Sequence, residues 1–317
     1  MSSVICTLFE GSHHYGVAAL INSLSAQGYR GVVYAGYRGP LPAWAASAKE
    51  DLASSWSGSR TLEIIAGLTI TFLPFETKNH FSNCKPPLML RLWDSLARGA
   101  TAMFYIDPDI VLTTPWAAIE EWLSCGVTLC EDVNSPIPAY HPIRIAWRRY
   151  FGQKGFNLRF KDIIYANAGF VGISAENRSF LTTWQALMDA MAPAIGGLHN
   201  SGFTSGESAL FAPFDNADQD ALNATVEAWD GVVSLVGKEG MALTTGTSLM
   251  SHAIGRNKPW LLPPLGQALR GRPPRRADRD YWDMANEPIL AHPPGLVKRR
   301  KLEIKVASLI GRFYRRY

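Results

Sequence analysis

Residues 1–90 alternate between strand-like and helix-like patterns, and this alternation limits the possible folds more than any other feature. An apolar, β-rich run at 4–9 is followed, after a polar loop, by a segment at 16–27 whose apolar residues recur at helical spacing. Gly28 and a second strand at 31–35 come next. A strand, a helix and another strand in this order predict a parallel α/β sheet.

A later strand ends in acidic residues. The strand at 102–106 runs directly into Asp107, Pro108 and Asp109. Ligands of open α/β sheets bind at the carboxyl ends of the strands, so these carboxylates are well placed for chemistry. Two carboxylates one residue apart can reach one hard divalent cation while a diphosphate fills the remaining coordination positions. The same three residues also suit a type I turn, which leaves a purely structural role open.

A short loop further along the chain supplies matching groups. Residues 251–260 read Ser-His-Ala-Ile-Gly-Arg-Asn-Lys-Pro-Trp. His252 can give a neutral imidazole nitrogen to the same metal, Gly255 lets the backbone approach a phosphate, and Lys258 offers a positive charge to phosphate oxygens. Together with the two aspartates, this loop predicts a site for a metal and a diphosphate.

The composition indicates a folded globular chain. Its 317 residues are 47% hydrophobic and 18% charged, which excludes disordered, collagenous and coiled-coil classes. No apolar run reaches the roughly 18 residues of a membrane-spanning helix, and residues 1–20 lack the pattern of a secretory signal, so we expect a cytoplasmic protein. The cysteines lack the spacing of metal or redox sites, and Cys6 and Cys130 lie in apolar runs typical of buried positions.

The charge is unevenly distributed along the chain. Residues 295–317 contain eight lysines and arginines against Glu303 alone, so this tail carries +7 and the remainder −3 of a net charge of +4. Before the tail, proline and arginine are frequent within 266–294, which predicts an exposed linker. The sequence therefore predicts a slightly acidic body joined to a strongly basic tail.

The tail has the pattern of an interfacial helix. Its apolar residues recur every three or four positions among basic ones, which predicts a basic amphipathic helix that associates with an anionic membrane surface through 298–317. The apolar positions are Leu302, Val306, Leu309, Phe313 and Tyr317. A terminal helix that packs its apolar stripe on the body is the alternative. No nucleic-acid recognition motif accompanies the charge, so no nucleic-acid partner is expected.

Four separated motifs point to one known family. Residues 105–110 read YIDPDI, 167–170 read NAGF, 218–223 read DQDALN and 252–260 read HAIGRNKPW. They resemble, in order and spacing, the D-x-D, N-x-G, D-Q-D-x-L-N and H-x-x-G-x-x-K-P-W motifs of the GT-A fold glycosyltransferases, most closely the retaining glycosyltransferase family 8. The resemblance extends from residue 4 to about residue 260.

This resemblance implies an α/β fold of the GT-A type, which is a Rossmann-like nucleotide-diphospho-sugar transferase fold with a mixed central sheet. The domain would occupy residues 1–265, followed by the linker at 266–294 and the basic amphipathic helix at 295–317. The aromatic and basic stretch at 134–160 would be an inserted arm on the acceptor side.

The resemblance also implies roles for individual residues. Asp107, Asp109 and His252 would bind a divalent cation, Mn²⁺ or alternatively Mg²⁺. The nucleotide diphosphate would contact Lys85, Asp107, Pro108, Gly255 and Lys258. The donor sugar would lie among Asn167, Ala168, Gly169, Asp218 and Gln219, and the last two would be catalytic. Lys85 also precedes a predicted helix at 86–96, where phosphate can bind.

The nucleobase site departs from the family pattern. Family members usually carry a D-x-N-Y-like stretch after the first strand, whereas residues 7–15 of this chain read TLFEGSHHY. The backbone of Thr7 and Leu8 would hold uracil, and Tyr15 or His13 would stack on it. On the family resemblance, the expected donor is a UDP-sugar.

The expected function is metal-dependent transfer of a sugar to a glycan or lipid-linked acceptor, with retention, in cell-surface polysaccharide synthesis at the inner face of the membrane. Gln219 carries no formal charge, so it favours a front-face departure over a covalent intermediate. An inverting transferase would need a base, for which Glu207 and Asp215 are the candidates. Another nucleotide-sugar enzyme, such as a nucleotidyltransferase, and a non-catalytic sugar-nucleotide-binding or membrane-binding protein remain as alternatives.

Overall fold

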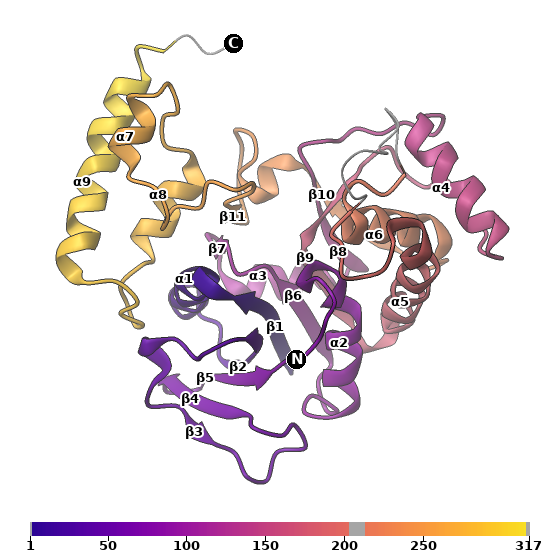
Figure 1. Cartoon of the computed structure of the whole chain (residues 1–317), viewed down its shortest axis with the longest axis horizontal. Helices are drawn as coiled ribbons and strands as arrows, with labels where there is room; N and C mark the ends of the chain where they lie inside the picture. Colours follow the sequence, from indigo (N-terminus) through magenta and orange to yellow (C-terminus); the bar gives the residue numbers. More distant parts are fainter. Residues whose placement is uncertain (1, 203–212, 315–317) are drawn as a thin grey trace.

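A computed structural model describes residues 2–202 and 213–314 of the chain. Its centre is a mixed β-sheet flanked by helices, as the sequence predicts (Figure 1). Within the described residues this sheet has nine strands, in the order β10 (Val233–Val236), β8 (Val127–Glu131), β9 (Ala166–Ser174), β6 (Ala102–Ile106), β1 (Ser3–Glu10), β2 (Gly31–Arg38), β5 (Leu68–Pro74), β4 (Arg60–Ile65) and β3 (Lys49–Glu50).

The strand directions decide where chemistry can occur. The strands β6, β1, β2 and β5 are parallel, and β9 is antiparallel to both β6 and β8. Parallel neighbours end at the same edge of the sheet, so the residues that follow β1 and β6 lie next to each other. Because β9 runs the other way, its first residues reach this same edge.

Helices cover both faces of the sheet. Along β1, Cys6 and Leu8 enter one apolar cluster while Ile5 and Phe9 enter the other, because successive side chains of a strand point to opposite faces. Cys6 and Cys130 are both fully buried, which confirms the sequence prediction. The helices of the body are α1 (His14–Ala26), α2 (Lys85–Asp94), α3 (Trp116–Leu123), α4 (Pro142–Gln153), α5 (Ser179–Met191) and α6 (Ala217–Ala228).

The segment predicted as an exposed linker, 266–294, is folded against the body, so that prediction is wrong. It includes the end of α7 (Pro264–Ala268) and all of α8 (Arg276–Asp283), and Trp282 in α8 is only 1% exposed. Tyr281 and Trp282 form a third apolar cluster with Ala19 of α1. The amide of Asn22, also in α1, donates to the carbonyl of Ile289. Buried aromatic residues outweigh the loop-forming tendency of the prolines around them.

The C-terminal helix, α9 (Pro294–Gly311), lies beside α7 and α8 (Figure 1). Its residues Val297 and Ile304 belong to this cluster, and Ala307 is also buried. Three residues of the stripe predicted from the sequence lie on another side of the helix: Leu302, Val306 and Leu309 are 63%, 43% and 54% exposed. Phe313 follows the end of the helix and is 84% exposed, and Tyr317, the last residue of the predicted stripe, lies outside the described residues. The helix therefore both packs on the body and presents an apolar stripe to solvent. None of the helices in the described part of the chain is long and apolar enough to cross a membrane.

His292 couples this C-terminal layer to acid stability. Its ring stacks on Tyr15, and burial together with His14 and Arg300 lowers its pKa to about 4. The unfolded chain binds this proton near the ordinary histidine pKa of about 6.5, so stability is lost as the pH falls from there toward 4. We expect His292→Phe, which keeps an aromatic ring but does not titrate, to flatten the fall in Tm between pH 6.5 and 4. His199→Gln, at an exposed position, is the control, and an unchanged slope in His292→Phe would contradict the assignment.

Candidate active site

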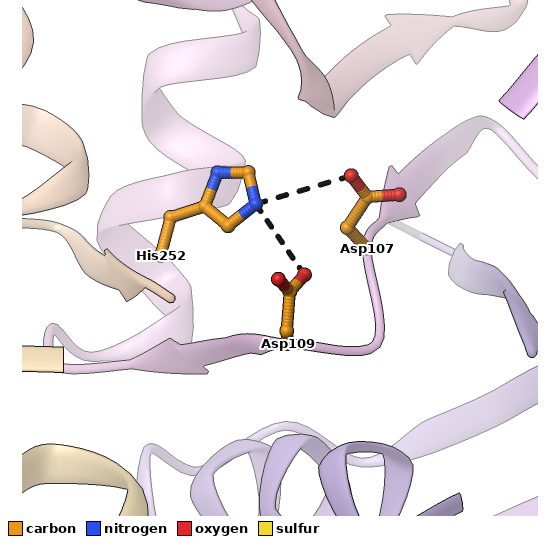
Figure 2. A group of neighbouring side chains, drawn as sticks. All are labelled: Asp107, Asp109 and His252. Atoms are coloured by element: carbon orange, nitrogen blue, oxygen red, sulfur yellow. Dashed lines mark ion pairs between the residues drawn. The ribbon is translucent and has the colours of Figure 1, made fainter. Parts of the chain in front are cut away.

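The Asp-Pro-Asp segment joins β6 to the short strand β7 (Ile110–Leu112). The amide of Ile110 donates to the Asp107 carbonyl at 3.1 Å, so the segment is a tight turn, as the structural interpretation predicts. Both carboxylates nevertheless face His252 (Figure 2). The turn therefore has a structural role and also places two ligand groups at the carboxyl end of a buried strand.

His252 reaches the aspartates through a second, two-stranded sheet. It is the last residue of β11 (Met250–His252), which pairs antiparallel with β7 so that His252 lies opposite Ile110. The Nε2 atom of His252 is 3.3 Å from Asp109 Oδ1 and 4.0 Å from Asp107 Oδ2. The ligand atoms of the three residues all lie within 4.8 Å of one another.

The donor set suits a divalent cation. Two carboxylates and one imidazole nitrogen are ligands that Mn²⁺ and Mg²⁺ accept, with positions left for phosphate and water. Gly169 leaves the space for this set, because a Cβ there would lie 2.6 Å from His252 Cε1 and 2.9 Å from Asp107 Oδ2. The residues present therefore fit a metal ion bound by Asp107, Asp109 and His252.

Two lysines balance the acidic groups. Lys85, which is 4% exposed, lies 2.7 Å from Asp218 Oδ2 and 3.6 Å from Asp107 Oδ1. Burial opposes its charged form, but these two carboxylates outweigh burial and raise the pKa of Lys85. Lys258 contacts Asp109. Burial acts to raise the pKa of Asp109, yet His252 and Lys258 hold it well below its usual range.

The helix α6 contributes Asp218 and Gln219 from its first turn. It begins at Ala217. Asp220 accepts a hydrogen bond from the Asn216 amide and so stabilises the start of the helix, while Asp218 pairs with Lys85. Asn223 bonds both the amide and the carbonyl of Ala166, which ties α6 to β9.

The residues predicted around the donor sugar are held by one another. Gln219 Oε1 accepts from the Ala168 amide at 3.2 Å, and Asn167 Oδ1 accepts from the Gly169 amide. Asn167 donates to Asp132 at 2.6 Å. Asp132, at 4% exposure, has no sequence signal of its own and sets the orientation of the Asn167 amide.

A cleft of about 370 Å³ brings most of the predicted residues together. It is lined by Leu8, Lys85, Asp107, Pro108, Asp109, Asn167, Ala168, Gly169, Asp218, Gln219, His252, Gly255 and Lys258. Gly255 has φ +81°, a left-handed backbone conformation that glycine adopts without strain. The lining also includes residues outside the predicted set: Phe9, Glu10, His80, Phe81, Ser82, Tyr105 and Ile254, together with His13, which is the alternative stacking residue.

Several predicted residues lie elsewhere. Thr7 is fully buried within β1, and Tyr15 stacks on His292 with ring centroids 4.4 Å apart, so neither lines the cleft. Thr7 is enclosed within the sheet, and Tyr15 is held by the C-terminal layer. Asp215, a candidate base for inversion, is exposed and outside the cleft lining. Glu207, the other candidate, lies outside the described residues.

The solved structures similar to this chain include glycosyltransferases. The galactosyltransferase LgtC, solved with donor and acceptor sugar analogues, aligns over 94% of this chain and 99% of its own, with a TM-score of 0.52 and 14% identity. GlyE of Streptococcus pneumoniae aligns over 96% and 64%, with a TM-score of 0.51 and 12% identity.

The bifunctional glycosyltransferase WbbM aligns over 95% of this chain, with a TM-score of 0.50 and 13% identity, and this chain spans about half of it, 52%. No protein-family model matches the sequence, and curated proteins show no significant sequence similarity to it. The chain therefore has the GT-A glycosyltransferase fold, as the motifs predict.

Proposed function

We propose that this chain is a metal-dependent glycosyltransferase that moves a sugar from a nucleotide-diphosphate donor, UDP-linked, to a glycan or lipid-linked acceptor with retention of configuration. The observation that carries this proposal is the convergence of Asp107, Asp109 and His252 beside two lysines, at the carboxyl edge of a GT-A sheet. Cell-surface polysaccharide synthesis is the process in which we expect it to act.

The mechanism follows from these groups. Asp107, Asp109 and His252 would hold a divalent cation, which would supply Lewis-acid stabilisation to the diphosphate leaving group. Lys258 can exchange its contact with Asp109 for one with a phosphate oxygen, which adds a fixed positive charge at the leaving group. Gly255 lets the backbone of the same loop approach the phosphates.

Gln219 and Asp218 act at the sugar. Gln219 Oε1 accepts a hydrogen bond from the Ala168 amide, which orients the side chain in the cleft lining. In our proposal its carbonyl dipole stabilises the positive charge that develops at the anomeric carbon. The neutral amide is a poor nucleophile, so we infer a front-face departure in which the acceptor enters on the side that the diphosphate leaves. Asp218, which pairs with Lys85 and lines the cleft, would accept hydrogen bonds from sugar hydroxyls.

A panel of nucleotide sugars, with and without Mn²⁺, tests the proposal through thermal shift and donor hydrolysis. Stabilisation by one donor only when Mn²⁺ is present, lost in His252→Ala, is expected, and that donor names the sugar. The anomeric configuration of the product, read by NMR, separates retention from inversion. If the protein responds to no donor, the proposed activity is contradicted and the similarity to glycosyltransferases is limited to the fold.

Gly169 provides a further test of the metal site. We expect Gly169→Ala to weaken Mn²⁺ binding, because the added methyl group would displace His252 and Asp107. The expected loss is about 10- to 100-fold, as when groups that orient metal ligands are lost. Electron paramagnetic resonance of free Mn²⁺ measures this directly. Gly99→Ala, where a Cβ meets no atom within 4 Å, is the matched control. Equal affinity in both variants would count against the assigned ligands.

We further propose that α9 attaches the protein to the inner face of an anionic membrane. Its exposed residues Leu302, Val306 and Leu309, with Phe313 just beyond its end, lie among basic residues. Both apolar burial and attraction to anionic lipids support binding in the plane of the surface. We expect co-sedimentation with phosphatidylglycerol vesicles but not with phosphatidylcholine vesicles, weakened by salt.

Paired substitutions test this attachment. Leu302→Ser with Leu309→Ser should reduce vesicle binding by about 30- to 900-fold, since each removes about 1–2 kcal/mol of apolar burial. The control is Leu52→Ser, because Leu52 is 90% exposed and lies far from α9 in the sequence. Binding that is equal on both lipids, or unaffected by the paired substitutions, would contradict a membrane role for this stripe.

A further inference from the structure

The loop at 254–258, which we call the diphosphate loop, is anchored at its base and exposed at its tip. It contains Gly255 and Lys258, which line the cleft. Just before it, the Ala253 amide donates to the Asp109 carbonyl at 3.0 Å, which fixes the base of the loop beside the metal ligands. The middle three residues of the loop are exposed. Exposed backbone of this kind needs further contacts if it is to keep one conformation.

The side chain of Arg275 supplies such contacts from outside the loop. Its Nη1 donates to the Ile254 carbonyl at 2.7 Å, and its Nη2 donates to the Asn257 carbonyl at 2.8 Å. These are the distances of strong, charge-assisted hydrogen bonds. Within the described part of the chain, Arg275 is the one side chain found to hydrogen-bond the backbone of the diphosphate loop. One guanidinium therefore bridges the two ends of the exposed tip.

Arg275 is itself held by α8. It is the residue before the helix, and Asp278 in the first turn accepts from its backbone amide at 2.8 Å and from its guanidinium at 2.9 Å. The helix packs on the body through Tyr281 and Trp282, which are both buried. The guanidinium is thus fixed to a buried helix on one side and to an exposed loop on the other.

A fixed carbonyl also fixes the amide of the same peptide bond. A trans peptide is planar, and its N–H points opposite to its C=O. Because the Ile254 carbonyl points to Arg275, the N–H of Gly255 points away from Arg275. Among residues 2–202 and 213–314, no hydrogen-bond partner is found for this N–H. An unpaired, oriented amide in the cleft lining is a suitable donor to a phosphate oxygen.

We propose that Arg275 is a positioning residue for the diphosphate loop, which it orders in advance so that the Gly255 amide and the Lys258 ammonium meet a diphosphate together. The inference rests on the proposed function, because it takes the ligand of this loop to be a diphosphate. Arg275 does not belong to the cleft lining, so it acts through the loop. Without it, the loop would have to be ordered each time the ligand binds, and this cost would weaken the affinity.

The mobility of the Gly255 amide tests whether Arg275 orders the loop. In full-length protein labelled with ¹⁵N-glycine, we expect its order parameter to be about 0.85 and to fall below about 0.6 in Arg275→Gln. Arg279→Gln, which removes the same charge at an exposed position of α8, is the matched control and should leave it unchanged. A rigid Gly255 amide in Arg275→Gln would overturn the proposal.

Inorganic pyrophosphate with Mn²⁺ tests the effect on binding. We expect Arg275→Gln to raise the Kd for pyrophosphate about tenfold, the scale of ordering a short loop on binding. Mn²⁺ affinity without pyrophosphate should stay unchanged, because Arg275 does not contact the metal ligands. A role confined to the stability of α8 would lower Tm but leave this Kd unchanged, and that result would refute the inference.

Arg275→Lys separates positioning from charge. It keeps the positive charge but replaces the planar guanidinium fork with a single ammonium, which cannot hold both carbonyls in the same geometry. We therefore expect weaker pyrophosphate binding in this variant as well. The Arg275 side chain is 38% exposed, so both variants are expected to fold. Full affinity in Arg275→Lys would show that charge alone is needed and would contradict a positioning role.

The pyrophosphate titration also separates this inference from the proposed function. If the unaltered protein binds pyrophosphate with Mn²⁺ and Arg275→Gln weakens it, but no nucleotide sugar binds, the proposed function fails and the role of Arg275 stands. If the unaltered protein does not bind pyrophosphate with Mn²⁺, the inference is overturned.

Discussion

Asp109→Asn should reduce sugar transfer about 10³-fold, at the upper end of the loss seen when one group that stabilises transition-state charge is removed. Asp109 contacts both His252 and Lys258, and its side chain is only 6% exposed. The amide has the same shape as the carboxylate but carries no charge. It therefore removes a charged metal ligand and also leaves the Lys258 ammonium without its partner.

Two measurements separate these effects of Asp109→Asn. Mn²⁺ affinity, followed by electron paramagnetic resonance, should fall together with kcat. Asp215→Asn, an exposed position outside the cleft lining, should leave both unchanged. Transfer at the normal rate by Asp109→Asn would contradict the proposed metal site. Loss of activity with normal Mn²⁺ affinity would mean that Asp109 acts only through its ion pair with Lys258.

Glu227→Gln should lower the free energy of unfolding by about 3–5 kcal/mol, which is the usual cost of breaking a buried ion pair by removing one partner. The Glu227 side chain is fully buried and lies 2.5 Å from Arg144, which is 2% exposed, and 3.0 Å from Arg148. The variant leaves two guanidinium groups near an uncharged amide. Arg144 also donates to the Ile137 carbonyl, so the ion pairs join α6 to the 134–160 segment.

Thermal unfolding measures this loss. For a domain of this size, the expected fall in Tm is roughly 5–10 °C. Glu121→Gln, at an exposed position on α3, is the control and should change Tm little. Because the cost arises from the charge left behind, Arg144→Met with Glu227→Leu should be less destabilising than the sum of the two single variants. Additive losses would show that the pair is not coupled.

Local pattern was sufficient for the parts of the site that are close in sequence. The strand that ends in Asp107 and Asp109 is read from its apolar run, and the carboxyl edge of a parallel sheet follows from the strand and helix order. The loop from His252 to Lys258 shows its chemistry through residue types alone. Its meeting with the aspartates was predicted from matching residue types and from the motifs of a family, because no short-range pattern links the two segments.

Sequence patterns did not predict which residues are buried or which residues far apart in the chain contact each other. Tyr15 follows the first strand and looks available for stacking, yet its ring is taken by His292 from the other end of the chain. The 266–294 segment reads as a linker because prolines and arginines dominate its composition, but Trp282 buries it against α1. Asp132 has no motif, and only its contact with Asn167 gives it a role.

The sequence by itself determined the class of fold, the acidic turn after β6 and the basic loop after β11, because each depends on residue type and short-range spacing. Only the tertiary structure decided which groups face one another. The pairing of β7 with β11 sets His252 opposite Ile110 and beside Asp109. Strand register and side-chain packing are collective properties of the folded chain, so no local pattern encodes them.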